Sequence, residues 1–235
     1  MGDMRASVGP YIGAMSKECH LTLTSSVGQI AAFQAAGARR TLYSQVGLDW
    51  AEDVMGEPAW EPPFRIPDVV FCSNYYGSAF PGSPERVEAV AALLHAGIDV
   101  GVVGQGWPRG FPVVGKCGVK QQTHVYRRAK VALSVNNFND VELFYSDRHL
   151  IALASGTPLV SRYVPGLERE FTNGRHLLRY STPGELVESV RSLLGSEDLR
   201  RRIGRQGRAE AIRSHTWFSR ILSVLPHVEE EAATL

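Results

Sequence analysis

From residue 68 onward, short apolar runs alternate with helix-like segments, and this alternation constrains the fold more than any other feature. The run at 68–73 (Asp-Val-Val-Phe-Cys-Ser) has a continuous apolar centre, which is typical of a strand buried on both faces of a parallel sheet. Similar runs cover 99–103 and 131–135, and another begins at 158. Because strands that alternate with helices form mostly parallel, doubly wound sheets, we predict an α/β domain of that class.

Helix signals fill the intervals between these runs. Pro84 and Gly97 mark the two ends of one helix, in which Val87, Val90 and Leu94 share an apolar face. Further helices are predicted at 148–155, 183–195 and 197–214. The acidic run at 229–231 is expected to form a frayed end.

A proline-rich segment at 57–67 separates the alternating region from the start of the chain. Its four prolines cannot continue a helix or occupy a central strand, so we place a domain boundary there. The prediction is a short α/β remnant in residues 1–60 and a larger α/β domain in residues 61–235. In the remnant, one helix lies between two strands: 19–24 (strand), 27–36 (helix) and 41–43 (strand).

The charge balance excludes a general electrostatic attraction to nucleic acids or anionic membranes. The formal net charge is +1, from 25 basic and 24 acidic residues, so a nucleic-acid role depends on a local patch. One candidate patch on the last predicted helix, for which a solvated face is the alternative, consists of Arg200, Arg201, Arg202, Arg205 and Arg208. No apolar run reaches the ~18 residues of a membrane span, and no signal peptide opens the chain, so we expect a cytoplasmic protein.

Cysteine and histidine spacing excludes a zinc site, and no bound metal is predicted. Cys19, Cys72 and Cys117 are far apart and form no Cys-x-x-Cys pair, and the seven histidines show no metal-ligand spacing. An odd number of cysteines fits a reducing compartment. Because Cys19 and Cys72 lie in or beside apolar runs, both are expected to be buried, inert thiols.

Ligands of doubly wound sheets bind outside the C-terminal ends of the strands, so the loops there are candidate sites. After the first strand, Gly77 and Ser78 could bring backbone N–H groups to a phosphate; a plain turn is the alternative. After the second strand, Gly106 and Trp107 lie in a Gly-x-Gly-x-x-x-Gly segment, whose spacing excludes the usual dinucleotide fingerprint. Trp107 either stacks on a base or packs in the core.

The loop after the third strand is the most polar of them. Its candidate ligand-binding residues are Asn136, Asn137, Tyr145, Ser146 and Asp147. Ser146 or Asp147 can cap the helix that follows, and Arg148 lies in its first turn, where a cation is unfavourable unless it faces a negative partner. A diphosphate at the helix N-terminus is such a partner; an ion pair with Asp147 or Glu142 is the alternative.

Four short motifs occur in an order typical of one enzyme family: Tyr-Ser-Asp-Arg at 145–148, Ala-Leu-Ala-Ser-Gly-Thr-Pro-Leu-Val at 152–160, Tyr-Val-Pro-Gly-Leu-Glu at 163–168 and His-Thr-Trp at 215–217. Together they resemble the C-terminal domain of group 1 glycosyltransferases, in particular the CgeB-like and phage-associated branch. The Gly-Asp-Met-Arg at 2–5 also resembles an element of that branch. The resemblance covers nearly the whole chain, and 145–171 is its most specific part.

The resemblance implies the donor-binding half of a GT-B fold, in which two Rossmann-like domains face each other. A nucleotide-diphosphate sugar is then the substrate, with its diphosphate at Ser146, Asp147 and Arg148 and its nucleotide between the loops that follow Ser73 and Val103. The resemblance further implies a hexosyltransferase that needs no metal or other cofactor, because cationic side chains and a helix N-terminus stabilise the leaving diphosphate.

Two features depart from the family pattern. Ile151 stands where group 1 enzymes usually carry a donor-contacting glutamate, so donor identity and stereochemistry cannot be transferred. Most of an N-terminal acceptor domain is absent, so we expect a partner chain or a second protomer to supply that half, and Asp3 is the candidate catalytic base. The acceptor is unknown. The alternatives are a non-catalytic nucleotide-sugar-binding module, an epimerase, and a phage-type enzyme that glycosylates DNA.

Overall fold

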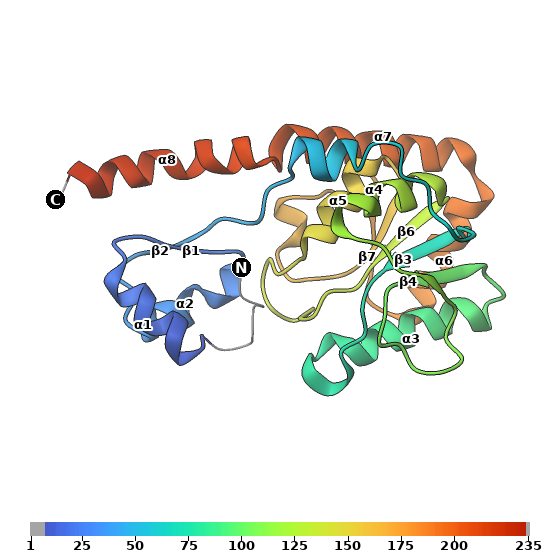
Figure 1. Ribbon diagram of the computed structural model, residues 1–235, viewed down its shortest axis with the longest axis horizontal. Helices are drawn as coiled ribbons and strands as arrows, with labels where there is room; N and C mark the ends of the chain where they lie inside the picture. Colours follow the sequence, from blue (N-terminus) through green and yellow to red (C-terminus); the bar gives the residue numbers. More distant parts are fainter. Residues whose placement is uncertain (1–7, 234–235) are drawn as a thin grey trace.

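The structure, a computed structural model, describes residues 8–233: a large unit, a small N-terminal unit, and a long C-terminal helix that runs from one to the other (Figure 1). The large unit holds a six-stranded sheet in the order β5-β4-β3-β6-β7-β8, and every neighbouring pair is parallel. Its strands are β3 (Val69–Cys72), β4 (Val100–Val103), β5 (Val113–Gly115), β6 (Val131–Ser134), β7 (Leu159–Arg162) and β8 (Leu178–Tyr180). The predicted doubly wound α/β class is confirmed.

The sheet reverses its strand order between β3 and β6. Strands β3, β4 and β5 follow one another to one side and β6, β7 and β8 to the other, so the C-terminal ends of β3 and β6 flank a topological switch point. Val69 of β3 pairs with Val100 of β4 and also with Val131 of β6. Every residue of β3, β4 and β6 is buried, as expected of apolar strands in a sheet that helices cover on both faces.

Helices form one layer on each face of this sheet. α3 (Gly82–His95) packs with α6 (Pro183–Gly195) on one face, and α4 (Val119–Arg128), α5 (Asp147–Ser155) and α7 (Glu197–Ser214) pack together on the other (Figure 1). The three helices predicted at 148–155, 183–195 and 197–214 are confirmed. All residues from His149 to the end of α5 are buried, so the loop before this helix has a rigid support.

The small unit is a strand–helix–strand fragment with one additional helix. α1 (Pro10–Glu18) precedes β1 (Thr22–Thr24), and α2 (Ile30–Ala35) leads to β2 (Thr41–Tyr43), which pairs with β1 in parallel. The elements at the start of the chain are therefore of the predicted kinds. Cys19, however, is exposed, so its predicted burial is wrong: the strand begins only at Thr22, and Cys19 lies in the turn after α1.

The segment between the units belongs structurally to the large one. A short π-helix at Trp50–Met55, which Asp49 caps, packs against α4 and α5. The proline-rich segment 57–67 then leads to β3, and a domain boundary at 60/61 stays a prediction. Within residues 8–233, no helix combines the length and the apolar character needed to cross a bilayer.

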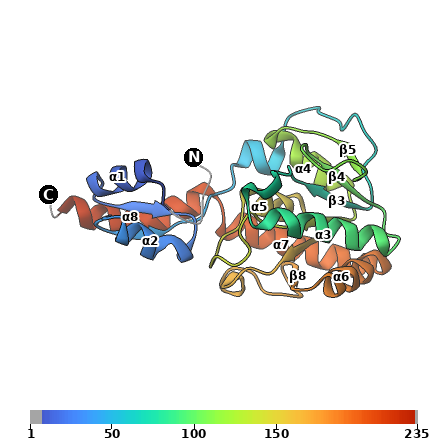
Figure 2. The ribbon, with the colours of Figure 1, turned by 90° about the horizontal axis from the view of Figure 1, so that it is seen from below.

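The C-terminal helix α8 (Trp217–Ala233) follows α7 and extends beside the small unit (Figures 1 and 2). There, Glu230 and Glu231 each lie 3.0 Å from a guanidinium nitrogen of Arg40. The frayed end predicted at 229–231 is therefore wrong, because these carboxylates have a basic partner that is distant in sequence.

Candidate functional site

Two cavities lie at the C-terminal edge of the large sheet, and Arg148 lines both of them. The central cavity has a volume of about 390 Å³, and its walls come mainly from the segments 72–74, 103–105 and 116–118. The outer cavity, of about 440 Å³, lies between the loop 144–148 and residues of the segment 45–53. The central cavity is built on the ends of β3 and β4, which is where doubly wound sheets bind ligands.

The N-terminus of α5 lies at the junction of these cavities. Ser146 is its N-cap residue, as one of the two predicted alternatives had it, although its side chain makes no capping hydrogen bond. The backbone N–H of Ser146 donates to the side-chain oxygen of Asn136 at 3.1 Å. Asn136 is fully buried, and its own backbone N–H donates to the side-chain oxygen of Asn139 at 3.0 Å. Asn136 thus positions the loop from behind, without lining either cavity.

Arg148 presents a positive charge to both cavities. No carboxylate within residues 8–233 forms an ion pair with it, and Glu142, one predicted partner, pairs with Arg169 instead. Asp147, the other predicted partner, accepts a hydrogen bond from the backbone N–H of Arg148 at 2.9 Å. The ion-pair alternative therefore finds no support, and a cation in a first helical turn is left facing a cavity, where an anion can bind it.

A second arginine, Arg86 of α3, lies buried at the switch point. Its guanidinium donates to the backbone oxygens of Asn74 at 2.7 Å and Val135 at 3.2 Å, and to the side-chain oxygen of Asn137 at 2.6 Å. These hydrogen bonds fasten the loops after β3 and β6 to each other. Burial, and then the charge of Arg148, lower the pKa of Arg86 to about 10, so it remains cationic at neutral pH. Two guanidinium groups therefore place positive charge near the ends of β3 and β6.

Sequence analysis missed Arg86 because it assigned the wrong face to α3. The structure buries Arg86, Val90 and Leu93, whereas Leu94 is 41% exposed. The spacing of the buried residues is that of a regular helical stripe, so a signal was present. An arginine normally interrupts such a stripe; here, loop oxygens satisfy its guanidinium.

The predicted residues of the first two loops lie beside the cavities, because the walls are formed nearer to the strand ends, by Asn74 and Gly104. Neither cavity is lined by any of the four residues predicted in these loops: Gly77, Ser78, Gly106 and Trp107. The indole N–H of Trp107 donates to the backbone oxygen of Ser73 at 2.7 Å, and its ring packs against Phe71 and Phe111. Of its two predicted roles, these contacts support packing.

The third loop carries its predicted residues to the outer cavity, whose wall includes Asn137, Tyr145, Ser146, Asp147 and Arg148. This loop therefore brings together most of the residues expected to bind a diphosphate. Asp3, the predicted base, lies outside the described residues, 8–233.

The outer cavity also gathers carboxylates that sequence analysis did not consider. Asp49, Glu52 and Asp53 precede the proline-rich segment and line the cavity together with Asp147. Burial raises the pKa of Asp53, and the three neighbouring carboxylates raise it further, while a hydrogen bond from the backbone of Asp49 opposes them. A carboxyl with a raised pKa in a cleft suits proton transfer. Within residues 8–233, no three His, Cys, Asp or Glu side chains are arranged to hold a metal ion.

Glu170 joins three parts of the chain behind the outer cavity. Its carboxylate accepts hydrogen bonds from the hydroxyl of Tyr43 in β2, at 2.6 Å, and from that of Tyr145. It also lies 3.6 Å from a guanidinium nitrogen of Arg220 in α8. The small unit, the wall of the outer cavity and α8 therefore meet at one largely buried charge.

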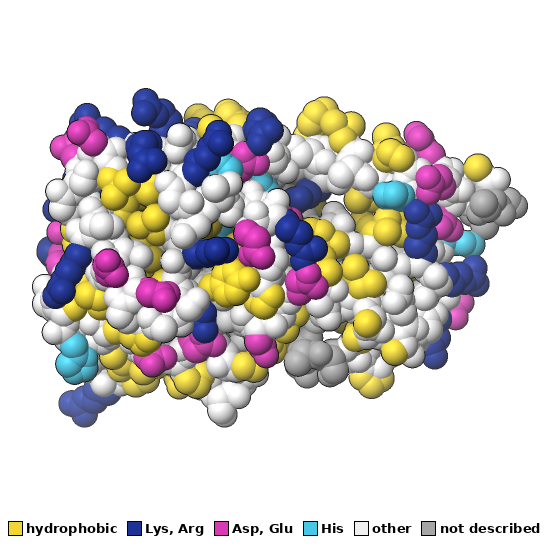
Figure 3. Space-filling view, turned by 180° about the vertical axis from the view of Figure 1, so that it is seen from behind, with side chains coloured by type: hydrophobic (Ala, Val, Ile, Leu, Met, Phe, Trp, Pro, Cys, Tyr) yellow, Lys and Arg dark blue, Asp and Glu magenta, His cyan; other side chains and the backbone are white. Residues whose placement is uncertain are grey.

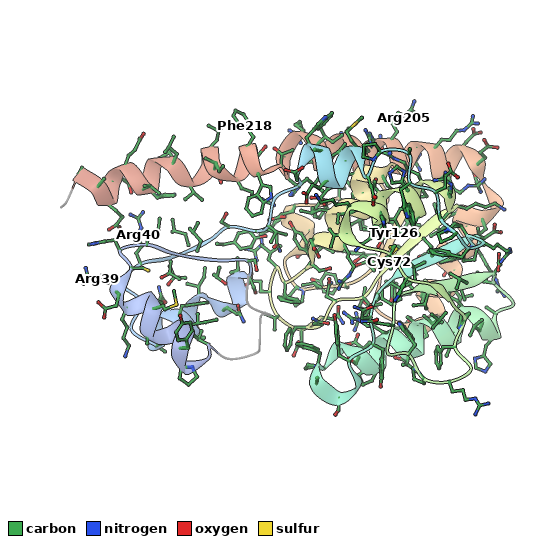
Figure 4. The ribbon with its side chains drawn as sticks, viewed as in Figure 1. Arg39, Arg40, Cys72, Tyr126, Arg205 and Phe218 are labelled. Atoms are coloured by element: carbon green, nitrogen blue, oxygen red, sulfur yellow. The ribbon has the colours of Figure 1, made fainter. Side chains whose placement is uncertain are left out.

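The arginines of α7 act mainly within the molecule. Arg200 donates to backbone oxygens at the end of α6, and Arg208 donates to that of Ala154 near the end of α5. Arg201 forms an ion pair within its own helix. Arg205 points outward (Figure 4), and basic side chains gather along the upper edge of Figure 3 with acidic ones among them. Two of the five arginines of the predicted nucleic-acid patch, Arg200 and Arg208, are thus engaged at helix ends, and a third, Arg201, is engaged in an ion pair.

Residues 85–225, more than half of the chain, match the family described as Glycosyl transferase-like. The chain belongs to this family. The match confirms the predicted glycosyltransferase relationship, while the CgeB-like, phage-associated branch stays a prediction. No curated protein sequence matches this glycosyl transferase-like chain significantly.

Solved structures with a similar fold include several glycosyltransferases. Sucrose-phosphate synthase from Thermosynechococcus elongatus is 19% identical, with a TM-score of 0.63 over 96% of this chain and 62% of that chain. HepE of Anabaena in complex with UDP-glucose is 13% identical, with a TM-score of 0.65 over 97% and 69%. The pneumococcal O-GlcNAc transferase GtfA in complex with UDP and GlcNAc is 16% identical, with a TM-score of 0.60 over 94% and 47%. This chain thus spans between 47% and 69% of the length of these three structures, and the predicted Rossmann-like half of a GT-B fold is confirmed.

Proposed function

We propose that this chain binds a nucleotide-diphosphate sugar and transfers the sugar to an acceptor, as the donor-binding half of a glycosyltransferase. The observation that carries the proposal is Arg148: a cation without an ion pair in residues 8–233, at the N-terminus of α5, shared by two cavities at the switch point. The family match and the nucleotide complexes of two structural neighbours support it. Branch membership, hexosyl transfer and a cytoplasmic location belong to the same proposal.

The geometry supports a binding mode in which each cavity holds a different part of the donor. The central cavity receives the nucleotide, since β3 and β4 end there and Asn74 and Gln105 offer polar groups to a base or ribose. The diphosphate then lies at Arg148, and the sugar extends into the outer cavity. As the bond to the sugar breaks, negative charge grows on the leaving diphosphate, and Arg148 and the α5 N-terminus stabilise it. This chemistry requires neither a metal ion nor another cofactor.

Asp53 is our candidate for the base that accepts a proton from the acceptor. It lines the same cavity as Arg148, and the direction of its pKa shift brings it nearer to neutral pH. Asp3 lies outside the described residues, and its role as the base stays a prediction.

We further propose that a partner chain or a second protomer supplies the acceptor-side half. A two-stranded sheet is only marginally stable on its own, and Leu23 of β1 is 47% exposed. On α8, Phe218 is 70% exposed and points away from both units (Figure 4). These apolar surfaces suit a further polypeptide that extends the small unit. A non-catalytic nucleotide-sugar-binding module remains the alternative, since such a module needs the same donor site.

The experiment that tests the donor site is a thermal-shift screen of this protein with UDP-, GDP-, ADP-, CMP- and dTDP-linked sugars. Stabilisation by one nucleotide family is the expected result, because ligands that bind only the folded state raise its stability. If none of them stabilises the protein, the donor-binding proposal fails. The nucleotide sugar that binds is then tested for turnover. Release of nucleoside diphosphate indicates an enzyme, and binding without release indicates a binding module.

A further inference from the structure

Cys72 and Cys117 are distant in sequence but meet in the wall of the central cavity. Cys72 ends β3 and is buried, whereas Cys117 lies between β5 and α4 and is half-buried. Each thiol acts on the pKa of the other, since Cys117 raises that of Cys72 and Cys72 lowers that of Cys117, and the hydroxyl of Tyr126 acts on Cys72 as well; Figure 4 labels Cys72 and Tyr126. The burial predicted for Cys72 is confirmed, but the spacing of the cysteines gave no indication of this contact.

We propose that Cys72 and Cys117 form a reversible oxidation site, at which a hydroperoxide converts the two thiols into a disulfide that closes the central cavity to nucleotide diphosphates. Formation of the bond depends only on the two thiols. Its effect on nucleotide binding rests on the proposed function.

The two cysteines differ in the ways that such a reaction needs. The hydrogen bond from Cys72 lowers the pKa of Cys117, which favours its thiolate, and the cavity gives a small oxidant access to it. Burial raises the pKa of Cys72 well above its usual value, so Cys72 remains a thiol until its partner reacts. Cys117 is therefore the attacking residue and Cys72 the resolving one.

The reaction balances in two steps. The thiolate of Cys117 attacks one peroxide oxygen, the O–O bond breaks, and the leaving hydroxide takes up a proton to become water, which leaves a sulfenic acid on Cys117. The sulfur of Cys72 then attacks the sulfur of Cys117, the S–O bond breaks, and a second water departs with the proton of Cys72. The two thiols lose two electrons and hydrogen peroxide gains them. A dithiol reductant reverses the change.

The disulfide would cross the end of β4. Cys72 pairs with Val103 of β4, and Val103 pairs with Gly115 of β5, so the two cysteines stand on either side of that strand. A disulfide is only ~2.05 Å long, well below any hydrogen-bond contact between sulfurs, so oxidation draws the segment 116–118 toward β3. Because that segment and the end of β3 form opposing walls of the central cavity, the cavity narrows where the nucleotide is proposed to bind.

The test uses the full chain with Cys19→Ser, which removes the exposed cysteine and any disulfide between molecules. The protein is treated with hydrogen peroxide, denatured and alkylated with iodoacetamide, and its intact mass is measured; a second sample is reduced with dithiothreitol before the same alkylation. We expect a mass lower by two hydrogens and no alkylation after oxidation, and two alkylations after reduction. A second Cys117→Ser substitution in the same background is the matched control. Cys117 is only half-buried, so this control should fold, and it should form no intramolecular bond.

Binding of UDP, GDP and ADP to the oxidised and reduced Cys19→Ser protein tests the consequence. We expect about tenfold weaker binding of the preferred nucleotide after oxidation, restored by dithiothreitol and absent from the control. An oxidised protein in which both cysteines still alkylate overturns the site, and a disulfide that leaves the affinity unchanged overturns its control of the cavity. If the reduced protein binds none of the three nucleotides, the proposed function fails, while the mass measurement still decides whether the bond forms.

Discussion

The hydroxyl of Tyr43 donates a hydrogen bond of 2.6 Å to the carboxylate of Glu170, and this contact joins the small unit to the large one. Because Tyr145 donates to the same carboxylate and Arg220 lies beside it, Glu170→Gln should lower the free energy of unfolding by about 1.5–3 kcal/mol. Urea denaturation at neutral pH measures the change. Glu168→Gln, which replaces an exposed carboxylate nearby in the sequence, is the control and should change the free energy of unfolding by less than about 0.5 kcal/mol. Equal effects of the two variants would contradict the role given to Glu170.

Two buried histidines predict a loss of stability in mild acid. Burial lowers the pKa of His149 to about 3 and that of His215 to about 4. Unfolded histidines titrate near ~6.5, so below that pH the unfolded chain binds protons that the folded chain does not. The free energy of unfolding is therefore fully retained above about pH 6.5 and falls as the pH drops toward 4, by at most ~1.4 kcal/mol per pH unit for each histidine.

Urea denaturation at about pH 7 and about pH 5 checks this slope. His149→Gln should reduce it by about half, because one of the two buried imidazoles is then absent. A variant with the same slope as the unsubstituted protein would show that His149 is not a source of the acid sensitivity.

Arg148→Ala should weaken binding of the preferred nucleoside diphosphate by about 1.5–3 kcal/mol, the contribution of a charge-assisted contact. Isothermal titration calorimetry measures the affinity, and the unfolding midpoint reports whether the fold is intact. Arg205→Ala is the matched control, since Arg205 points outward from α7 and lines neither cavity (Figure 4). Unchanged affinity in a folded Arg148→Ala protein would remove the basis of the donor site.

Asp53→Asn should lower the rate of nucleoside diphosphate release from the preferred nucleotide sugar by about 10²–10⁴-fold and leave nucleotide affinity unchanged. The amide keeps an oxygen that can accept the hydrogen bond from Asp49, so the local helix should persist. Glu61→Gln is the control, because Glu61 forms an exposed ion pair with Arg128 and lines neither cavity. A similar rate in both variants would exclude Asp53 as the base.

Gly104→Ala should destabilise the protein and distort the central cavity. A Cβ at this position lies 2.0 Å from the backbone oxygen of Ser73, and backbone at a strand end cannot easily move away. We expect a loss of about 1–3 kcal/mol in the free energy of unfolding. Gly195→Ala at the end of α6 meets no atom within 4 Å and should be neutral or stabilising by at most about 1 kcal/mol. Thermal or urea unfolding compares the two variants.

The architecture of the large unit could be predicted because its central elements carry strong periodic signals. β3, β4 and β6 are continuous apolar runs, and α7 begins and ends where its sequence indicates. The edge strands β5 and β8 escaped prediction, since each is three residues long and only partly buried. α8 was not predicted, because its acidic run indicates a solvated tail. Only the fold brings Arg40 beside these carboxylates.

The candidate site could be predicted at the level of loops but only partly at the level of residues. Arg148 and its neighbours lie where the helix start and the motif placed them. Arg86 could have been found from the helical spacing of Arg86, Val90 and Leu93, but the wrong face was assigned to α3. Glu170 could not be found in this way, because it acts through partners that only the packing of distant segments brings together. Cys72 and Cys117 likewise reach the wall of one cavity only because β3 and β5 end at the same edge of the sheet.

The helix α8 has a consequence for how the protein is made. Arg40 meets Glu230 across 190 residues of chain, so during translation the small unit leaves the ribosome long before the helix that anchors it has been synthesised. Domains that emerge first generally fold first. The small unit, with its two-stranded sheet, instead has to wait for a late segment, and during that interval its apolar surface is open to chaperones or to another polypeptide chain.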